Sequence, residues 1–121
     1  MFLDKLEVID EMDLGLPMDD NKYGVRHCEW LEVGKEIYLS VQASYMHYCI
    51  PRELTDLKNY SHFELALIQG DGLSYDIHIL NDFPRFDELE SYWEGGVFAY
   101  VPKDLINDLY YWALEYFKEE C

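Results

Sequence analysis

The sequence predicts an α+β fold, an antiparallel sheet of four to five strands with helices packed on it. Short runs in the middle of the chain alternate apolar and polar residues, which is typical of half-buried strands. Glycine-containing turns separate neighbouring runs, as in hairpins. The last part of the chain has apolar residues at helical spacing, which indicates a helix lying on the sheet.

The first element expected is a short helix over residues 2–13. Gly15 and Pro17 would end it, and a polar loop follows. The pattern behind it is a set of apolar residues at near-helical spacing: Phe2, Leu3, Leu6, Ile9 and Leu14.

A strand over 25–33 and a clearer one over 37–44 come next, joined as a hairpin at Val33-Gly34-Lys35. In the second strand Ile37, Leu39, Val41 and Ala43 alternate with Tyr38, Ser40, Gln42 and Ser44. The alternation places these two sets on opposite faces of the sheet.

A second hairpin follows a long irregular segment, residues 45–61. Its strands are expected over 62–69 and 73–80, with the turn at Gly70-Asp71-Gly72. Both runs alternate apolar and polar residues. Long loops inside compact domains are often functional, so the segment before this hairpin is itself a candidate site.

The C-terminal part predicts a short acidic helix over 87–93, a fifth strand over 97–101 and a long helix from Pro102 to about 119. Proline suits the first turn of a helix. The long helix has a broad apolar stripe opposite its acids, formed by Leu105, Ile106, Leu109, Trp112, Ala113, Tyr116 and Phe117.

Charge is the most unusual property of the chain. Its 121 residues, enough for a single domain over 1–121, carry 25 Asp and Glu against nine Lys and Arg, a formal net charge of −16. Such a field repels nucleic acid and anionic membranes and attracts basic surfaces. Solubility alone is the competing interpretation of this charge.

The acids concentrate in two clusters, residues 1–20 and 76–94, while 21–75 is nearly balanced. If the fold brings the clusters together, they form one negative face. Tyrosine, present 11 times, combines apolar area with a hydroxyl and is enriched at interfaces. The partner-binding surface expected from these features comprises Asp10, Glu11, Asp13, Asp19, Asp20, Asp82, Asp87, Glu88, Glu90, Tyr92, Trp93 and Glu94.

Motifs for catalysis, metal binding and cofactor binding are missing from the sequence. His62-Phe63-Glu64 lacks the downstream P-C-x-x-C of a zinc deaminase, and no paired Cys or His spacing supports a structural zinc site. Neither a G-x-S-x-G elbow nor a phosphate-binding glycine loop occurs. We therefore expect no catalytic residue, no metal and no cofactor.

An alternative site lies in the 45–62 loop. There Tyr45, His47, Tyr48, Cys49 and Arg52 could line a pocket for a small enzyme or ligand-binding domain. Arginine would hold an anionic ligand. Packing of a histidine and a buried thiol is the competing interpretation of His47 and Cys49.

The three cysteines, Cys28, Cys49 and Cys121, have no disulfide-framework spacing, and charges interrupt the first apolar residues, unlike a signal peptide. We expect a cytoplasmic protein with reduced thiols. No apolar run reaches the roughly 18 residues that a transmembrane helix needs.

In size, charge and composition the chain resembles small acidic inhibitors encoded by phages and mobile elements, of the anti-CRISPR or anti-restriction type, and acidic immunity proteins that neutralise nucleases. The resemblance implies an inhibitor acting in the host cytoplasm on a basic, nucleic-acid-binding protein such as a CRISPR effector or a nuclease. The most specific version of this hypothesis is that the protein mimics nucleic acid and binds no nucleic acid itself.

Overall fold

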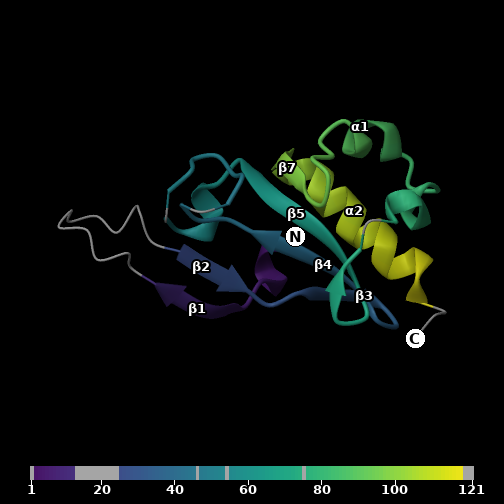
Figure 1. Ribbon diagram of the computed structural model, residues 1–121, viewed down its shortest axis with the longest axis horizontal. Helices are drawn as coiled ribbons and strands as arrows, with labels where there is room; N and C mark the ends of the chain where they lie inside the picture. Colours follow the sequence, from purple (N-terminus) through teal and green to yellow (C-terminus); the bar gives the residue numbers. More distant parts are fainter. Residues whose placement is uncertain (1, 13–24, 46, 54, 75, 119–121) are drawn as a thin grey trace.

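The computed structural model describes residues 2–12, 25–45, 47–53, 55–74 and 76–118. Its elements confirm the α+β prediction (Figure 1). In chain order they are the 3-10 helix η1 (Phe2–Lys5), strands β1 (Val8–Met12), β2 (Val25–Cys28), β3 (Leu31–Gly34) and β4 (Ile37–Gln42), η2 (Leu57–Asn59), strands β5 (His62–Gln69) and β6 (Gly72–Leu73), η3 (Ile77–Leu80), helix α1 (Phe86–Glu90), strand β7 (Phe98–Pro102) and helix α2 (Lys103–Tyr116).

Strand β5 is the centre of a five-stranded antiparallel sheet. It pairs with β4 along one edge, where Leu39 faces Leu67, and with β6 and β7 along the other. Strand β3 extends the sheet beyond β4. The hairpins predicted at the β3–β4 and β5–β6 turns are therefore present, and β7 is the predicted fifth strand.

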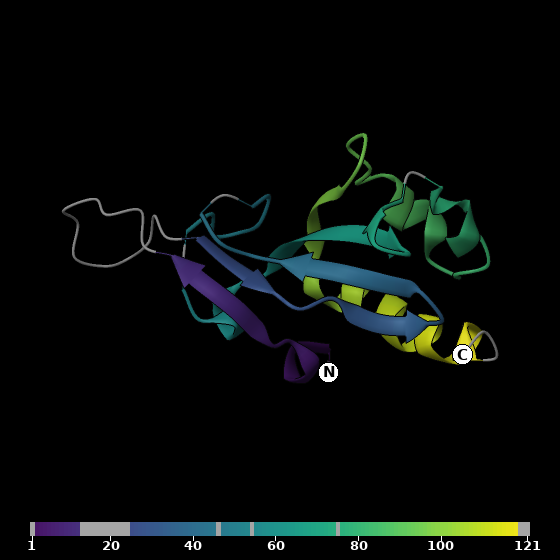
Figure 2. The ribbon, with the colours of Figure 1, turned by 60° about the horizontal axis from the view of Figure 1, so that its bottom comes forward.

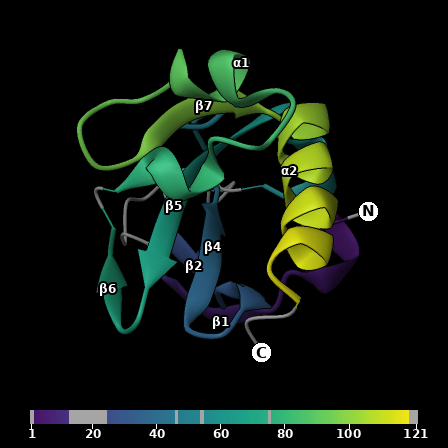
Figure 3. The ribbon, with the colours of Figure 1, turned by 90° about the vertical axis from the view of Figure 1, so that its right-hand side faces the viewer.

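Helix α2 packs on one face of this sheet and closes the core (Figure 3). Its side chains Leu105, Ile106 and Leu109 are fully buried, as the predicted apolar stripe requires. Gly34 in β3 lets the end of the helix approach, because a Cβ at this position would lie 2.7 Å from the Cβ of Phe117. A larger residue there would push the helix from the sheet.

The hairpin of β1 and β2 projects beyond one end of the five-stranded sheet (Figure 2). The side chain of Gln42, at the end of β4, joins the hairpin to the sheet. Its amide accepts a 2.7 Å bond from the Cys28 N–H and donates a 2.9 Å bond to the Cys28 carbonyl. A side chain here takes the place of a paired strand, which satisfies two buried backbone groups.

The predicted helix over 2–13 is wrong. Among the described residues 2–12 only Phe2–Lys5 are helical, and Val8–Met12 pair antiparallel with β2. Phe2 is fully buried in the core, with its ring 5.6 Å from that of Phe63. The apolar spacing that resembled one helix is divided between a helical turn and a strand containing β-branched Val8 and Ile9.

Two predicted strands are shorter than expected. The run over 25–33 is divided into β2 and β3, and the run over 73–80 contains only the end of β6 followed by η3. The carboxylate of Asp76 accepts a bond from the His78 N–H and caps η3. Side-chain capping by Asp competes with strand pairing, which accounts for the second difference.

Candidate functional site

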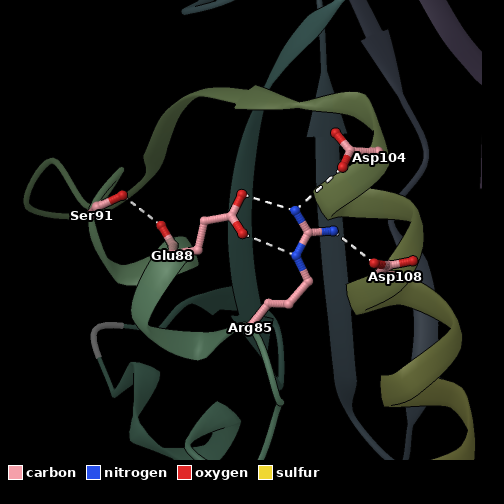
Figure 4. A network of polar contacts seen from close by, with 5 residues as sticks. All are labelled: Arg85, Glu88, Ser91, Asp104 and Asp108. Atoms are coloured by element: carbon pink, nitrogen blue, oxygen red, sulfur yellow. Dashed lines mark hydrogen bonds and ion pairs between the residues drawn. The ribbon is translucent and has the colours of Figure 1, made fainter.

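Arg85 lies between α1 and α2 and is surrounded by carboxylates (Figure 4). Its Nη1 donates a 2.6 Å bond to Asp108, and its Nη2 lies 3.3 Å from an oxygen of Asp104. Nε and Nη2 also donate to the two oxygens of Glu88, at 3.0 and 2.9 Å. Bidentate contacts of this kind between an arginine and a carboxylate define the relative orientation of the two groups as well as pairing their charges. They join the start of α1 to the outer face of α2.

A second contact between the same segments joins Tyr116 to Asp82. The Tyr116 hydroxyl donates a 2.5 Å bond to an Asp82 oxygen, and this bond raises the pKa of Tyr116. The tyrosine ring stacks on Trp112 at a centroid distance of 4.5 Å and is 46% exposed. We call the group formed by Asp82, Arg85, Glu88, Asp104, Asp108 and Tyr116 the acidic junction.

The acidic junction is strongly negative. Four carboxylates and one guanidinium give it a formal charge of −3, and all four acids are exposed. The bond to Asp108, followed by the contacts with Glu88 and Asp104, raises the pKa of Arg85. Since one cation serves several carboxylates, the surface retains excess negative charge for an incoming positive group.

The other residues predicted for the 82–94 surface differ in how exposed they are. Asp87 and Glu90 are exposed on α1. Tyr92 and Trp93 are half-buried, and the Trp93 ring lies 5.0 Å from that of Phe98. These two aromatic residues therefore support the core more than they contribute to a binding surface.

The structure describes only part of the N-terminal acidic cluster. Asp10 and Glu11 belong to β1, which lies at the opposite end of the molecule from α1 (Figures 1 and 2). Asp13, Asp19 and Asp20 lie outside the described residues. The condition under which the two acidic clusters would form one negative face is therefore not met by β1 and α1.

In the 45–62 loop, His47 and Cys49 are buried beside Ser44. The Ser44 hydroxyl lies 2.7 Å from His47 Nδ1, and the Cys49 thiol donates to the Ser44 carbonyl at 3.2 Å. Burial, with the nearby charges of His27, Arg26 and Arg52, lowers the pKa of His47 to about 4. Burial raises the pKa of Cys49. The pair has the properties of packed core residues, because a nucleophilic cysteine needs a lowered pKa and access.

Tyr48 is one of the exposed residues of the loop, and the Arg52 guanidinium lies 5.2 Å from its ring centroid. Arg52 Nε also donates to the carbonyl of half-buried Tyr45. The Tyr48 ring lies 5.8 Å from that of Tyr100, whose backbone has a φ of 57°. A concavity of about 320 Å³ here is lined by Tyr48, Glu94, Ala99 and Tyr100.

Two other tyrosines belong to the core. Tyr60 is 1% exposed and accepts a 3.1 Å bond from Arg26 Nη2, and Tyr110 is 6% exposed. In contrast, Tyr116, assigned to the buried stripe of α2, is exposed. Burial of a hydroxyl-bearing ring depends on tertiary partners, which spacing along the chain does not reveal.

Sequence reasoning missed the role of Asp104 and Asp108, which it assigned only to the solvent face of the last helix. The signal was present. These acids are separated by one helical turn and so share a face, and Arg85 is the only Lys or Arg within residues 76–94. A single arginine among many acids indicates that several carboxylates share its guanidinium as their partner.

Among the described residues no group of His, Cys, Asp and Glu is arranged to hold a metal ion. Within the same ranges no helix combines the length and apolar character needed to cross a bilayer. No protein-family model, curated protein or solved structure matches the chain.

Proposed function

We propose that the protein is a binding module that docks a basic protein partner on its acidic junction. The gathering of three carboxylates from α1 and α2 around a single guanidinium carries this proposal. The partner's Lys and Arg side chains would compete with Arg85 for the same oxygens. Long-range attraction by the net charge of −16 would speed their encounter.

Exposed aromatic residues beside the acids support a protein partner over a small cation. Tyr116 and Tyr111 are 46% and 43% exposed on α2. Tyrosines next to charged groups are typical of protein interfaces, where they supply contact area with little loss of rotamer freedom. The acidic junction would then steer the partner, and these rings would supply contact area.

In its more specific form the partner is a nucleic-acid-binding enzyme, such as a nuclease or a CRISPR effector, and the protein inhibits it as a nucleic-acid mimic. The overall charge, together with the similarity in size and composition to small acidic inhibitors, motivates this form. Because β1 lies away from the acidic junction, the acids of the α1–α2 side would carry the mimicry without those of β1.

Affinity capture tests the proposal. The immobilised protein is incubated with lysate of the organism that encodes it, eluted in steps of increasing salt, and the eluates are identified by mass spectrometry. We expect a basic protein that leaves the column at moderate salt, because exposed charges are screened over about 8 Å at physiological ionic strength. Competition by DNA or RNA supports the mimic. Retention only of proteins that elute independently of salt contradicts a docking driven by charge.

A further inference from the structure

A second concavity lies at the edge of the sheet, away from the acidic junction. It has a volume of about 540 Å³ and includes the β5–β6 turn, which lies at the bottom of Figures 1 and 3, whereas α1 lies at the top. Its lining residues are Glu29, Trp30, Glu32, Tyr38, Gly70 and Asp71.

Two aromatic rings form its apolar wall. Trp30, 43% exposed, lies just before β3, and Tyr38 lies on β4 with a ring centroid 5.8 Å from that of Trp30. Tyr38 alternates with buried Leu39, so its ring is on the sheet face opposite the core that α2 covers. A large aromatic residue this exposed adds little to a core, and its contact area is available to a ligand.

Carboxylates complete the concavity. Glu29 lies just before β3, Glu32 lies on β3 as the cross-strand neighbour of Tyr38, and Asp71 comes from the β5–β6 turn. Within the described part of the chain none of these three carboxylates takes part in an ion pair. The lining residues include no Lys or Arg.

We propose that this concavity binds a methylated ammonium group, held against the faces of Trp30 and Tyr38 and attracted by the three carboxylates. Cations within about 6 Å of a Trp or Tyr ring are attracted by its negative face, and aromatic residues in this arrangement recognise quaternary ammonium ligands. The proposal is independent of the acidic junction, because it concerns other residues on another part of the surface.

The angle between the rings selects the shape of the cation. The ring planes are tilted by 49°, so a planar guanidinium that stacks on one ring meets the other obliquely. A roughly spherical trimethylammonium group contacts both rings at any tilt. An unmodified lysine ammonium is strongly hydrated and gains less from an aromatic wall.

A nuclear magnetic resonance titration tests the proposal. Choline chloride is compared with 3,3-dimethylbutan-1-ol, its uncharged isostere, at constant ionic strength, by following the Trp30 indole N–H resonance. We expect choline to shift this resonance with a dissociation constant on the order of 1 mM, because the binding free energy of a ligand is limited by its small number of non-hydrogen atoms. The uncharged alcohol is expected to cause a much smaller shift. Equal shifts with both compounds, or no saturation with choline, would overturn the proposal.

Variants distinguish choline binding at this concavity from a nonspecific effect of choline on the protein. Trp30→Ala and Tyr38→Ala should each weaken choline binding at least about fivefold, whereas Trp30→Phe, which keeps an aromatic face, should retain most of it. Tyr111→Ala removes an equally exposed ring on α2 and should leave choline binding unchanged. For the alanine variants binding is followed by backbone amide shifts of Gly70 and Asp71. Unchanged choline binding by folded Trp30→Ala contradicts the site.

The source of the methylated ammonium is distinguished by a third ligand. Nα-acetyl-Nε-trimethyllysine amide presents the same head group on a peptide-like backbone. Binding at least about tenfold tighter than that of choline, a gain of about 1.4 kcal/mol, assigns the site to a methylated protein. Comparable or weaker binding assigns it to a free small molecule, and both results keep the proposed head-group chemistry.

Discussion

Arg85 and Asp108 are 23 positions apart in the chain, yet Arg85 Nη1 lies 2.6 Å from an Asp108 oxygen. This contact brings the loop before α1 onto the outer face of α2. It collects acids from separate segments into a single exposed group, the acidic junction. Both the proposed function and the first prediction depend on it.

Replacing Arg85 by glutamine should lower the free energy of unfolding by about 1 kcal/mol at low salt, at the upper end for exposed ion pairs because several carboxylates lose their shared cation. Urea unfolding at low and high salt measures the effect, which should shrink as salt screens the remaining acids. Lys103→Gln, the matched loss of one positive charge near the α2 N-terminus, should be nearly neutral. Equal stabilities of the two variants would contradict a structural role for Arg85.

Replacing Gln42 by leucine should destabilise the protein by about 2–3 kcal/mol, because it leaves the buried N–H and carbonyl of Cys28 without these partners. Urea unfolding followed by circular dichroism provides the measurement. Gln69→Leu, on the exposed end of β5, is the control and should cost less than about 1 kcal/mol. If both variants lose the same stability, the side chain of Gln42 does not hold the β1–β2 hairpin to the sheet.

His47 should make the protein less stable in mild acid. Its pKa is lowered in the folded state from 6.5 to about 4, so between these values the unfolded chain binds more protons. Stability is therefore full above pH 6.5 and falls as the pH decreases towards 4, by at most about 3 kcal/mol. Chemical unfolding of wild type and His47→Gln across this range isolates the effect.

The variant should have a shallower pH dependence than the wild type in that window. His78→Gln, which removes an exposed histidine, is the control and should follow the wild-type curve. Parallel curves for wild type and His47→Gln would show that His47 does not titrate abnormally.

Cys49 should resist alkylation in the folded protein, since it is 1% exposed and burial raises its pKa. Iodoacetamide labelling at neutral pH, followed by peptide mass spectrometry, should modify Cys49 only after denaturant is added. Rapid labelling of the native protein would instead indicate an accessible thiolate and would revive the interpretation of the 45–62 loop as a reactive site.

The parts of the fold that were predictable are those whose pattern is local. Strand β5 was expected over 62–69 and has these bounds, because its alternation and its glycine turn agree. The error over 2–13 arose because Phe2 enters the core while Val8–Met12 pair with β2. That outcome depends on pairing with β2, which lies beyond residues 13–24, and tertiary pairing overrides local periodicity.

The candidate site was predictable only in part for the same reason. The acids of 82–94 are visible in the sequence, but their relation to Asp104 and Asp108 depends on how α1 meets α2. Trp30 and Tyr38 are eight positions apart and become neighbours only through the β3–β4 hairpin. Aromatic content predicted a binding surface without indicating which rings remain exposed.

The central claim, that the acidic junction docks a basic partner, is tested most directly by comparing two charge-matched triple variants in the capture experiment. One carries Glu88→Gln, Asp104→Asn and Asp108→Asn. The other carries Glu7→Gln, Glu36→Gln and Asp56→Asn, exposed acids elsewhere on the surface. Circular dichroism is recorded for both variants as the control for folding. We predict that the first loses the salt-eluted partner at least about tenfold, a cost of about 1.4 kcal/mol, while the second retains it. Equal retention by both variants would contradict the claim.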